Sequence, residues 1–278
     1  MKSNWRPFYI FVFALFIGAC TTTYTEPDED GPEPSGAAVS SAKPARPFLK
    51  GYKNLVTQYH YAKVPEDITV EEKKLRFKAL LVPPVIKVYD ELNAEYQQVT
   101  QWMKIAEKRT RNARRARKKI AALKREYRAT TNEELLAALK PHPPSIVLAQ
   151  AALESAWGTS RFFVEARNVF GIWSFDENEP RIAAERRRGD QTIWLKKYKT
   201  IEDSVRDNYR VLARGSNYAD FRKMRLVSNN PYELVSGLAN YSEKGATYGE
   251  ILTSMISYDH FTDFDDVKFQ GASNQVSH

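Results

Sequence analysis

The sequence contains little cysteine and little histidine, and both shortages restrict how the fold can be stabilised. Its 278 residues include a single cysteine, Cys20, so no disulfide can form within the chain. The four histidines are scattered and lack the spacing of metal ligands, so we expect neither a metal site nor another cofactor. Apolar residues make up 42% of the chain, which is sufficient for an ordinary hydrophobic core.

The sequence also lacks an apolar run long enough to cross a membrane. The longest run at the N-terminus, residues 8–19, is shorter than the roughly 20 residues that a membrane helix needs. It follows Lys2 and Arg6, which is typical of an export signal. Because the run ends in Ile-Gly-Ala-Cys and so resembles a bacterial lipobox, we interpret residues 1–19 as a lipoprotein signal peptide. The alternative is an ordinary cleaved signal followed by an incidental cysteine.

Lipidation of Cys20 would make the membrane a partner of the protein. Several acyl chains anchor a protein stably, whereas one chain binds only marginally. Thr21 stands where lipoproteins retained at the inner membrane carry Asp, so by this sorting rule we expect a periplasmic protein that is lipid-anchored to the outer membrane. Residues 20–50 are rich in Pro, Gly, Ser and acidic side chains, and this composition predicts a disordered tether.

Residues 51–140 are expected to form a helical region that includes a long basic helix. The pattern predicts one helix over residues 66–82, a break or bend at Pro83 and Pro84, and a second helix from about Val85 to Arg128. Residues 104–128 contain twelve basic and two acidic side chains. This run is either a solvated helix face or a contact for anionic surfaces such as lipid headgroups or the cell wall. We expect no nucleic acid partner, because an exported protein does not meet chromosomal DNA.

Residues 141–264 are expected to form the catalytic domain, followed by a loose tail over residues 265–278. Ser145 is predicted to cap a helix that runs from Ile146 to Trp157. The segments IWSF and TIWLKKY are predicted to be strands that flank an Arg-rich segment. Helices return afterwards, and the first is expected to begin with a capping box between Thr200 and Asp203.

Glu154 is the residue in this domain that most clearly indicates chemistry. The helix that carries it contains only two other polar side chains, Gln150 and Ser155. Because burying an unpaired carboxylate is costly, such a residue either faces a cleft or is kept for a function. Partial burial beside Trp157 would raise its pKa. A carboxylic acid that stays protonated can donate its proton to a leaving oxygen, which is the first half of glycoside hydrolysis.

The segment LAQAALESAWGTSRFFVEARNVFGIWSF, residues 148–175, resembles the glucosaminidase family of peptidoglycan hydrolases, in particular its Bax-like branch. The resemblance continues more loosely to residues 238–256. It implies a mainly α (α+β) fold, in which a lysozyme-like helical domain carries a small β-hairpin lobe and follows a long-helix N-terminal region. It also implies cleavage of the β-1,4 bond between N-acetylglucosamine and N-acetylmuramic acid in peptidoglycan glycan strands.

The resemblance also implies roles for individual residues. Glu154 would be the general acid, and Tyr241 and Tyr248 would line the cleft opposite it. If no second carboxylate acts, Tyr241 could steady the developing charge. Asn168, Phe170 and Gly171 would shape the turn into the β-lobe. The residues predicted to bind substrate are Gln150, Trp157, Asn168, Phe170, Gly171, Trp173 and Tyr248.

A second catalytic carboxylate is harder to place, because the segment TIWL contains none. Glu185 and Asp190 are the candidates nearest to the expected hairpin. If neither acts, the acetamido oxygen of the substrate could serve as the nucleophile. Two other functions remain open at this point. One is a lytic transglycosylase, which also needs one helical Glu, and the other is a cell-wall-binding lipoprotein that has lost its activity.

Overall fold

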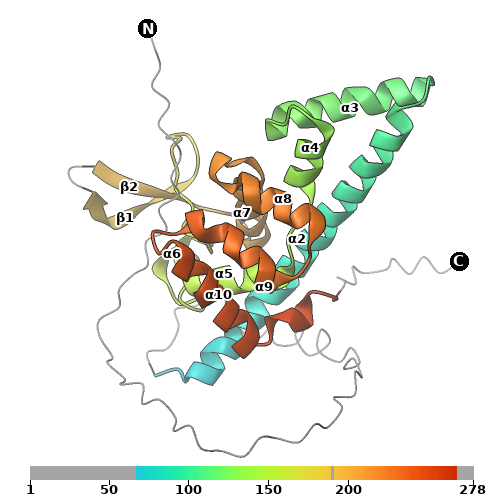
Figure 1. Cartoon of the computed structure of the whole chain (residues 1–278). Coiled ribbons are helices and arrows are strands. Elements are labelled where there is room, and N and C mark those ends of the chain that lie inside the picture. Colours follow the sequence, from blue (N-terminus) through green and yellow to red (C-terminus); the bar gives the residue numbers. More distant parts are fainter. Residues whose placement is uncertain (1–66, 189–190, 268–278) are drawn as a thin grey trace, which may run out of the picture.

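The computed structural model describes residues 67–188 and 191–267, which form helices and one small sheet (Figure 1). The predicted signal peptide, Cys20, the predicted tether and Asp190 therefore lie outside the described residues. The sheet has two antiparallel strands, so the predicted mainly helical fold with a β-hairpin is confirmed. None of the helices in the described ranges has both the length and the apolar character needed to span a membrane.

Helix α2, Val70–Ala106, is longer than the sequence pattern predicts. Thr69 is its N-cap, and the Thr69 side chain accepts a hydrogen bond from the backbone N–H of Glu72. It continues through Pro83 and Pro84, so the predicted break there is wrong. A proline inside a helix costs about 3 kcal/mol or more. Packing compensates for this here, because the residues on both sides of the pair, 79–82 and 85–86, are fully or almost fully buried.

Helix α3, Arg111–Tyr127, folds back along α2, so the single helix predicted from Val85 to Arg128 is in fact two. Thr110 caps its first turn by accepting a hydrogen bond from the backbone N–H of Ala113. The pair projects from the rest of the protein as an arm, and α4, Asn132–Leu139, packs beside it (Figure 1). A small core of its own holds this region together, with Val99, Ile120, Leu135 and Leu139 buried.

Helix α5, Pro144–Glu154, lies in the main core. Pro143 precedes it and makes no side-chain cap, so the prediction of Ser145 as the N-cap is wrong. Asp265 accepts hydrogen bonds from the backbone N–H and the hydroxyl of Ser145, at 2.7 and 2.8 Å. A carboxylate at a helix N-terminus is favourable because the helix dipole is positive there. The expectation of a loose tail from Asp265 onwards therefore does not hold for Asp265 itself.

The β-hairpin consists of β1, Arg181–Arg188, and β2, Gln191–Lys196. The Arg-rich segment is therefore a strand, whereas only a bridge between Trp173 and Leu195 joins IWSF to the hairpin. The strand predicted in TIWLKKY is confirmed as β2. The prediction for IWSF and for the Arg-rich segment failed because it required apolar side chains in a strand. A two-stranded hairpin that extends into solvent is built by backbone hydrogen bonds and leaves room for charged side chains on its exposed faces.

Short helices follow and close the domain. The first of them, α7, begins with the predicted capping box between Thr200 and Asp203. The remaining bounds are α6 Arg161–Ala166, α7 Ile201–Arg214, η1 Ser216–Tyr218, α8 Ala219–Val227, α9 Pro231–Leu234, η2 Val235–Tyr241, α10 Ala246–Tyr258 and η3 Phe261–Phe264. One hydrophobic core joins Phe77 of α2 to Val147 of α5 and Leu252 of α10. Residues on both sides of the predicted boundary at 140–141 thus share a core, and the domain limits stay a prediction.

Candidate active site

Glu154 is the last residue of α5, so it lies at the end of a buried helix and not in its middle. Its side chain is partly exposed, and its Oε1 accepts a hydrogen bond from the hydroxyl of Tyr248 at 3.0 Å. Burial raises the pKa of Glu154 to about 8, although the hydrogen bond from Tyr248 and the positive charge of Lys244 act in the opposite direction. The carboxyl group is therefore mainly protonated at neutral pH, as a general acid must be.

A chain of buried side chains leads to Glu154 from Tyr241 of η2, through Asn208 of α7. The hydroxyl of Tyr241 donates to Oδ1 of Asn208 at 2.9 Å, and Nδ2 of Asn208 donates to Oε1 of Gln150 at 3.5 Å. Nε2 of Gln150 donates to the hydroxyl of Tyr248 at 3.3 Å, and that hydroxyl donates to Glu154. Every donor in the chain thus points toward Glu154. Because Tyr248 accepts a hydrogen bond from Gln150, its own proton is free to go to Glu154.

The two tyrosines support this chain from behind Glu154. Tyr241 and Tyr248 are 1% and 0% exposed, so neither presents an open surface to a glycan strand. Their rings stack with centroids 5.3 Å apart and an interplanar angle of 18°. The stack and the hydrogen bonds keep both rings inside the core. Their predicted lining of the substrate cleft stays a prediction. The catalytic role predicted for Tyr241 stays a prediction.

The three residues after Ser155 have an unusual backbone conformation. Ala156, Trp157 and Gly158 all have positive φ, at 51°, 61° and 73°. This region suits glycine but is unfavourable for residues with a Cβ, by roughly 1–2 kcal/mol each. Two hydrogen bonds hold the turn, from the backbone N–H of Trp157 to Ala152 at 2.8 Å and from that of Gly158 to the Ser155 hydroxyl at 2.8 Å. The strained turn sets where α5 ends and hence where Glu154 lies.

We expect Ala156→Gly to stabilise the protein by up to about 1 kcal/mol. Glycine removes the strain of the positive φ, and this gain exceeds the roughly 0.4–1 kcal/mol lost through a more flexible unfolded chain. Ala121→Gly is the matched control, because Ala121 is exposed inside α3 and should lose about 1 kcal/mol. Urea unfolding of both variants tests this. Equal losses of stability would contradict the left-handed conformation of Ala156.

Trp157 packs against the first half of α2. Its ring meets Phe77 edge to face at 5.2 Å, and the Nζ of Lys74 lies 4.8 Å above it. Lys74 also forms an ion pair with Asp259 at 2.8 Å, which is 6% exposed. These contacts give Trp157 a role in packing the end of α5 against α2. Its predicted contact with substrate stays a prediction.

Asn168 ties the β-lobe to the helical domain. Its Nδ2 donates to the carbonyl oxygens of Ile172 and Lys196, both at 2.9 Å, and its Oδ1 accepts from the backbone N–H of Ile172 at 2.9 Å. Gly171 makes the turn between them with a φ of 65°, and Phe170 is buried in the core. The structure therefore supports the predicted shaping of this turn by the three residues.

The remaining predicted site residues belong to the β-lobe. Trp173 is half-buried, and its ring lies 6.1 Å from that of Phe175. Phe175 is 66% exposed. Glu185 lies on β1, but its side chain is not among those described, and Asp190 is outside the described residues. Neither candidate for the second carboxylate can be placed relative to Glu154.

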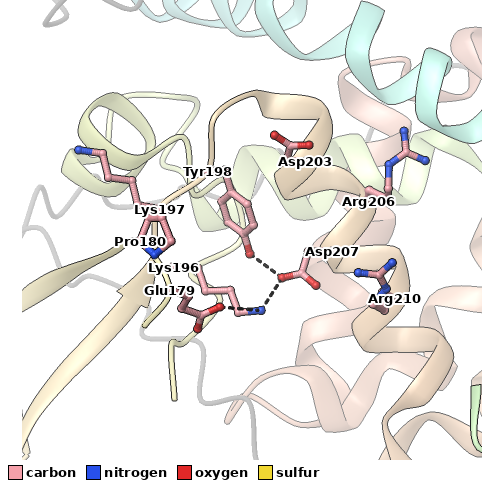
Figure 2. A pocket seen from close by; sticks show the side chains of 9 residues that line it. All are labelled: Glu179, Pro180, Lys196, Lys197, Tyr198, Asp203, Arg206, Asp207 and Arg210. Atoms are coloured by element: carbon pink, nitrogen blue, oxygen red, sulfur yellow. Dashed lines mark hydrogen bonds and ion pairs between the residues drawn. The ribbon is translucent and has the colours of Figure 1, made fainter. Parts of the chain in front are cut away.

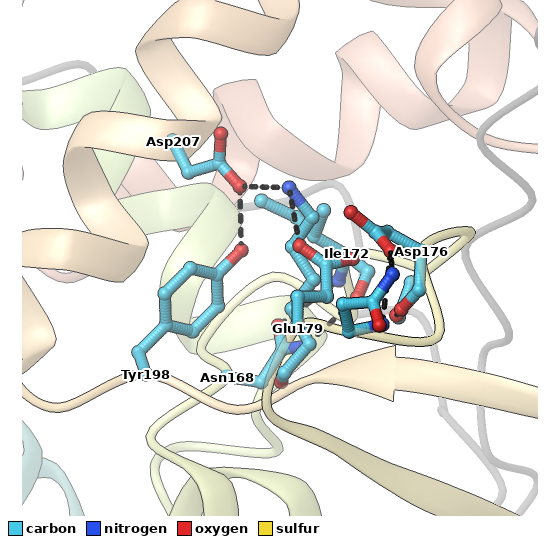
Figure 3. A network of polar contacts seen from close by, with 9 residues as sticks. Asn168, Ile172, Asp176, Glu179, Tyr198 and Asp207 are labelled. Carbon is cyan, nitrogen blue, oxygen red and sulfur yellow. Dashed lines mark hydrogen bonds and ion pairs between the residues drawn. The ribbon is translucent and has the colours of Figure 1, made fainter.

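A charged cavity of about 290 Å³ separates the β-lobe from α7 (Figure 2). Glu154 does not line it. Lys196 lies between Asp207 at 2.9 Å and Glu179 at 3.8 Å, and the hydroxyl of Tyr198 donates to Asp207 at 2.8 Å (Figure 3). Burial, together with the neighbouring charge of Asp207, raises the pKa of Tyr198. This network connects β2 to α7 and fixes the β-lobe on the helical domain.

Asn208 is the residue of the site that the sequence prediction missed. A signal for it was present, because Asn208 lies on the same stripe of α7 as the buried Ile201, Val205 and Leu212. A polar side chain on an apolar helix face is buried with a partner or for a function. The partner of Asn208 could not be predicted, since Gln150 and Tyr241 come from segments far apart in the sequence.

Comparison with known proteins found one family whose matched residues include the site. Residues 129–260 match the family described as mannosyl-glycoprotein endo-beta-N-acetylglucosaminidase. This range includes Glu154, Tyr241 and Tyr248. A search of curated proteins gave no match.

Three solved structures are similar to the chain. The catalytic domain of the autolysin Auto from Listeria monocytogenes has 16% identity and a TM-score of 0.44, over 80% of this chain and 99% of that one. The glycoside hydrolase domain of FlgJ from Salmonella typhimurium has 25% identity and a TM-score of 0.36, over 47% and 83%. An N-acetylmuramoyl-L-alanine amidase from Staphylococcus aureus has 21% identity and a TM-score of 0.36, over 54% and 44%. These scores are low, so the functional assignment depends on the family match.

Proposed function

Residues 129–260 belong to the glucosaminidase family, and on this premise we propose that the protein, a glycoside hydrolase, cleaves peptidoglycan with Glu154 as its general acid. The bond proposed is the β-1,4 linkage between N-acetylglucosamine and N-acetylmuramic acid. The observation that carries the proposal is the environment of Glu154, in which burial raises the pKa to about 8 and Tyr248 donates to Oε1. Together they provide an acid that is protonated at neutral pH and held in one orientation.

The hydrogen bonds also indicate which oxygen carries the acidic proton. Because Tyr248 accepts from Gln150 and donates to Oε1 of Glu154, Oε1 acts as an acceptor and the proton is on Oε2. In the proposed reaction this proton passes to the glycosidic oxygen while the bond from that oxygen to C1 of the sugar breaks. The carboxylate that remains keeps its hydrogen bond from Tyr248 and is favoured by the charge of Lys244.

Two alternative groups are proposed to stabilise the positive charge that develops at C1 of the sugar. Glu185 on β1 and Asp190 remain the candidates for a second carboxylate in the β-lobe. The other candidate is the 2-acetamido group of the substrate, whose carbonyl oxygen would form a bond to C1 as the glycosidic bond breaks. Water would then add at C1 and release the acetamido oxygen. Glu185→Gln and Asp190→Asn, made singly, separate the two schemes, because one of them would abolish activity only in the first scheme.

Digestion of purified sacculi tests the proposed bond. Mass spectrometry of the released muropeptides is expected to show new reducing ends on N-acetylglucosamine. The second candidate function, a lytic transglycosylase, is favoured by the single helical acid and would instead give 1,6-anhydromuramic ends. Binding to sacculi without any release of muropeptides would indicate the third possibility, a non-catalytic wall-binding lipoprotein, and would disprove the proposed activity.

The location of the enzyme is part of the proposal. The lipobox-like sequence before Cys20 supports a protein anchored to the outer membrane and facing the periplasm. Two or more acyl chains on Cys20 would hold it there. The mass of the mature N-terminal peptide tests this, because an unmodified Cys20 in the membrane fraction would rule out the anchor.

A further inference from the structure

The solvent-facing side of α3 forms a row of positive charges. At 3.6 residues per turn, five of its basic side chains fall within an arc of about 100°. We call these five the cationic face, and all are exposed: Arg111, Arg114, Arg115, Lys118 and Arg125. The row is about 21 Å long, because each residue of a helix rises about 1.5 Å. Ala113, Ala116 and Ile120 lie on the opposite side of α3 and are buried.

The charges of the cationic face are not neutralised by the residues that the structure describes. Among the described residues, none forms an ion pair with any of the five side chains. The only acidic residue of α3 is Glu126, next to the end of the row. Like charges placed this closely repel one another, so the row lowers the stability of the isolated helix. An external anionic partner would remove this repulsion.

The arm that carries the cationic face is held in shape from inside. The guanidinium of Arg117 donates to the carbonyl oxygens of Ala106 and Lys108, at 2.6 and 3.3 Å, and so closes the turn between α2 and α3. Near this turn the Nζ of Lys119 lies 4.3 Å above the ring of Trp102 on α2. The buried side of α3 is therefore occupied by α2, and only the charged side is free to meet a partner.

We propose that the cationic face binds the anionic headgroups of a phospholipid bilayer. A straight, rigid row of cations without large exposed apolar side chains on α3 fits a flat anionic surface, onto which it adsorbs without inserting. A bilayer is also within reach of the arm if Cys20 is lipidated. Cys20 and Asp67 are 47 positions apart in the sequence, and a chain of that length extends at most about 160 Å. The proposal does not depend on the hydrolase activity.

Vesicle binding of the full chain tests the proposal. The chain would carry Cys20→Ser in every variant, so that no acyl chain contributes. Partitioning is measured on phosphatidylcholine vesicles with and without phosphatidylglycerol, and the ratio of the two values is the readout. Binding by the apolar segment 8–19 contributes equally to both values, so it cancels in their ratio. Each cation near an anionic surface changes partitioning by roughly fivefold.

Two triple variants make the test specific. Replacing Arg111, Arg115 and Lys118 by Gln is expected to lower the ratio about a hundredfold. The matched control replaces three other exposed lysines by Gln and should leave the ratio nearly unchanged: Lys197, Lys199 and Lys223. Raising the salt from about 0.1 M to about 1 M should remove the preference of the unmodified face for anionic vesicles, because the Debye length falls from about 10 to about 3 Å.

Three outcomes would overturn the proposal. The first is an unchanged ratio in the variant of Arg111, Arg115 and Lys118. The second is an equally large fall of the ratio in the lysine control variant, which would mean that overall net charge and not the cationic face causes binding. The third is that the Arg111, Arg115 and Lys118 variant loses binding to purified sacculi but still binds anionic vesicles, which would make the cell wall the partner. Both variants should retain the circular dichroism spectrum and the sacculus digestion of the parent, because none of the six residues contacts Glu154 or its hydrogen-bond chain.

Discussion

Glu154→Gln is expected to abolish sacculus digestion while it stabilises the fold. The amide cannot donate a proton to the leaving oxygen, and loss of general acid catalysis typically lowers rates by about 10²–10⁴-fold. The amide oxygen can still accept the hydrogen bond from Tyr248, so the local geometry should persist. Muropeptide release from purified sacculi measures the first effect. Digestion at the parent rate would remove Glu154 from the mechanism.

The stabilising effect follows from the direction of the pKa shift. Below pH 4.5, the ordinary pKa of the carboxyl group, it is neutral in the folded and unfolded states, and the variant should gain little. Between pH 4.5 and about 8 only the unfolded state ionises, so the stability of the parent falls as the pH rises. Above about pH 8 both states are ionised and the difference stays constant. Because Gln does not titrate, the advantage of the variant should grow across this range and reach a few kcal/mol.

Thermal unfolding at several pH values measures this difference. Glu250→Gln is the matched control, since Glu250 is an exposed residue on α10 and should change neither activity nor stability appreciably. A gain in stability that did not depend on pH would mean that the amide packs better than the acid for reasons unrelated to ionisation. A loss of stability near pH 8 would contradict the buried, protonated state of Glu154.

The parts of this protein that could be predicted from the sequence are those determined by local chemistry. The capping box between Thr200 and Asp203 depends on a few neighbouring atoms, and it occurs in the structure. Glu154 was found for a similar reason, because a single acid on an otherwise apolar helix is a local anomaly. Its raised pKa then follows from burial in the folded domain.

The wrong predictions concern residues whose behaviour depends on distant segments. Pro83 and Pro84 remain inside α2 because the main core surrounds that part of the helix. Ser145 does not cap α5, since Asp265 arrives from 120 residues away to take that place. Asn208 was missed because its partners come from α5 and η2. For the prolines and for Ser145, tertiary contacts outweigh a local conformational or capping preference of about 1–3 kcal/mol.

Tyr248→Phe is expected to lower activity at neutral pH and to move the alkaline limb of the pH profile upward. The parent rate should fall as the pH rises through about 8, because Glu154 then loses the proton that it must donate. The hydrogen bond from Tyr248 stabilises the ionised form and so lowers the pKa of Glu154. Its removal should raise that pKa further, and the fall in rate should begin at a higher pH.

Two effects should reduce the rate of Tyr248→Phe near neutral pH. First, Oε1 of Glu154 loses the donor that orients the acid. Second, Nε2 of Gln150 loses its acceptor, and a buried polar group left unpaired lowers the stability of the folded site by about 1–3 kcal/mol. Tyr241→Phe is the comparison, because Tyr241 donates to Asn208 and its hydroxyl makes no hydrogen bond to Glu154. It should alter the rate but leave the alkaline limb near that of the parent. If Tyr248→Phe reduced activity with the limb unmoved, Tyr248 would support the fold of the site without tuning its acid.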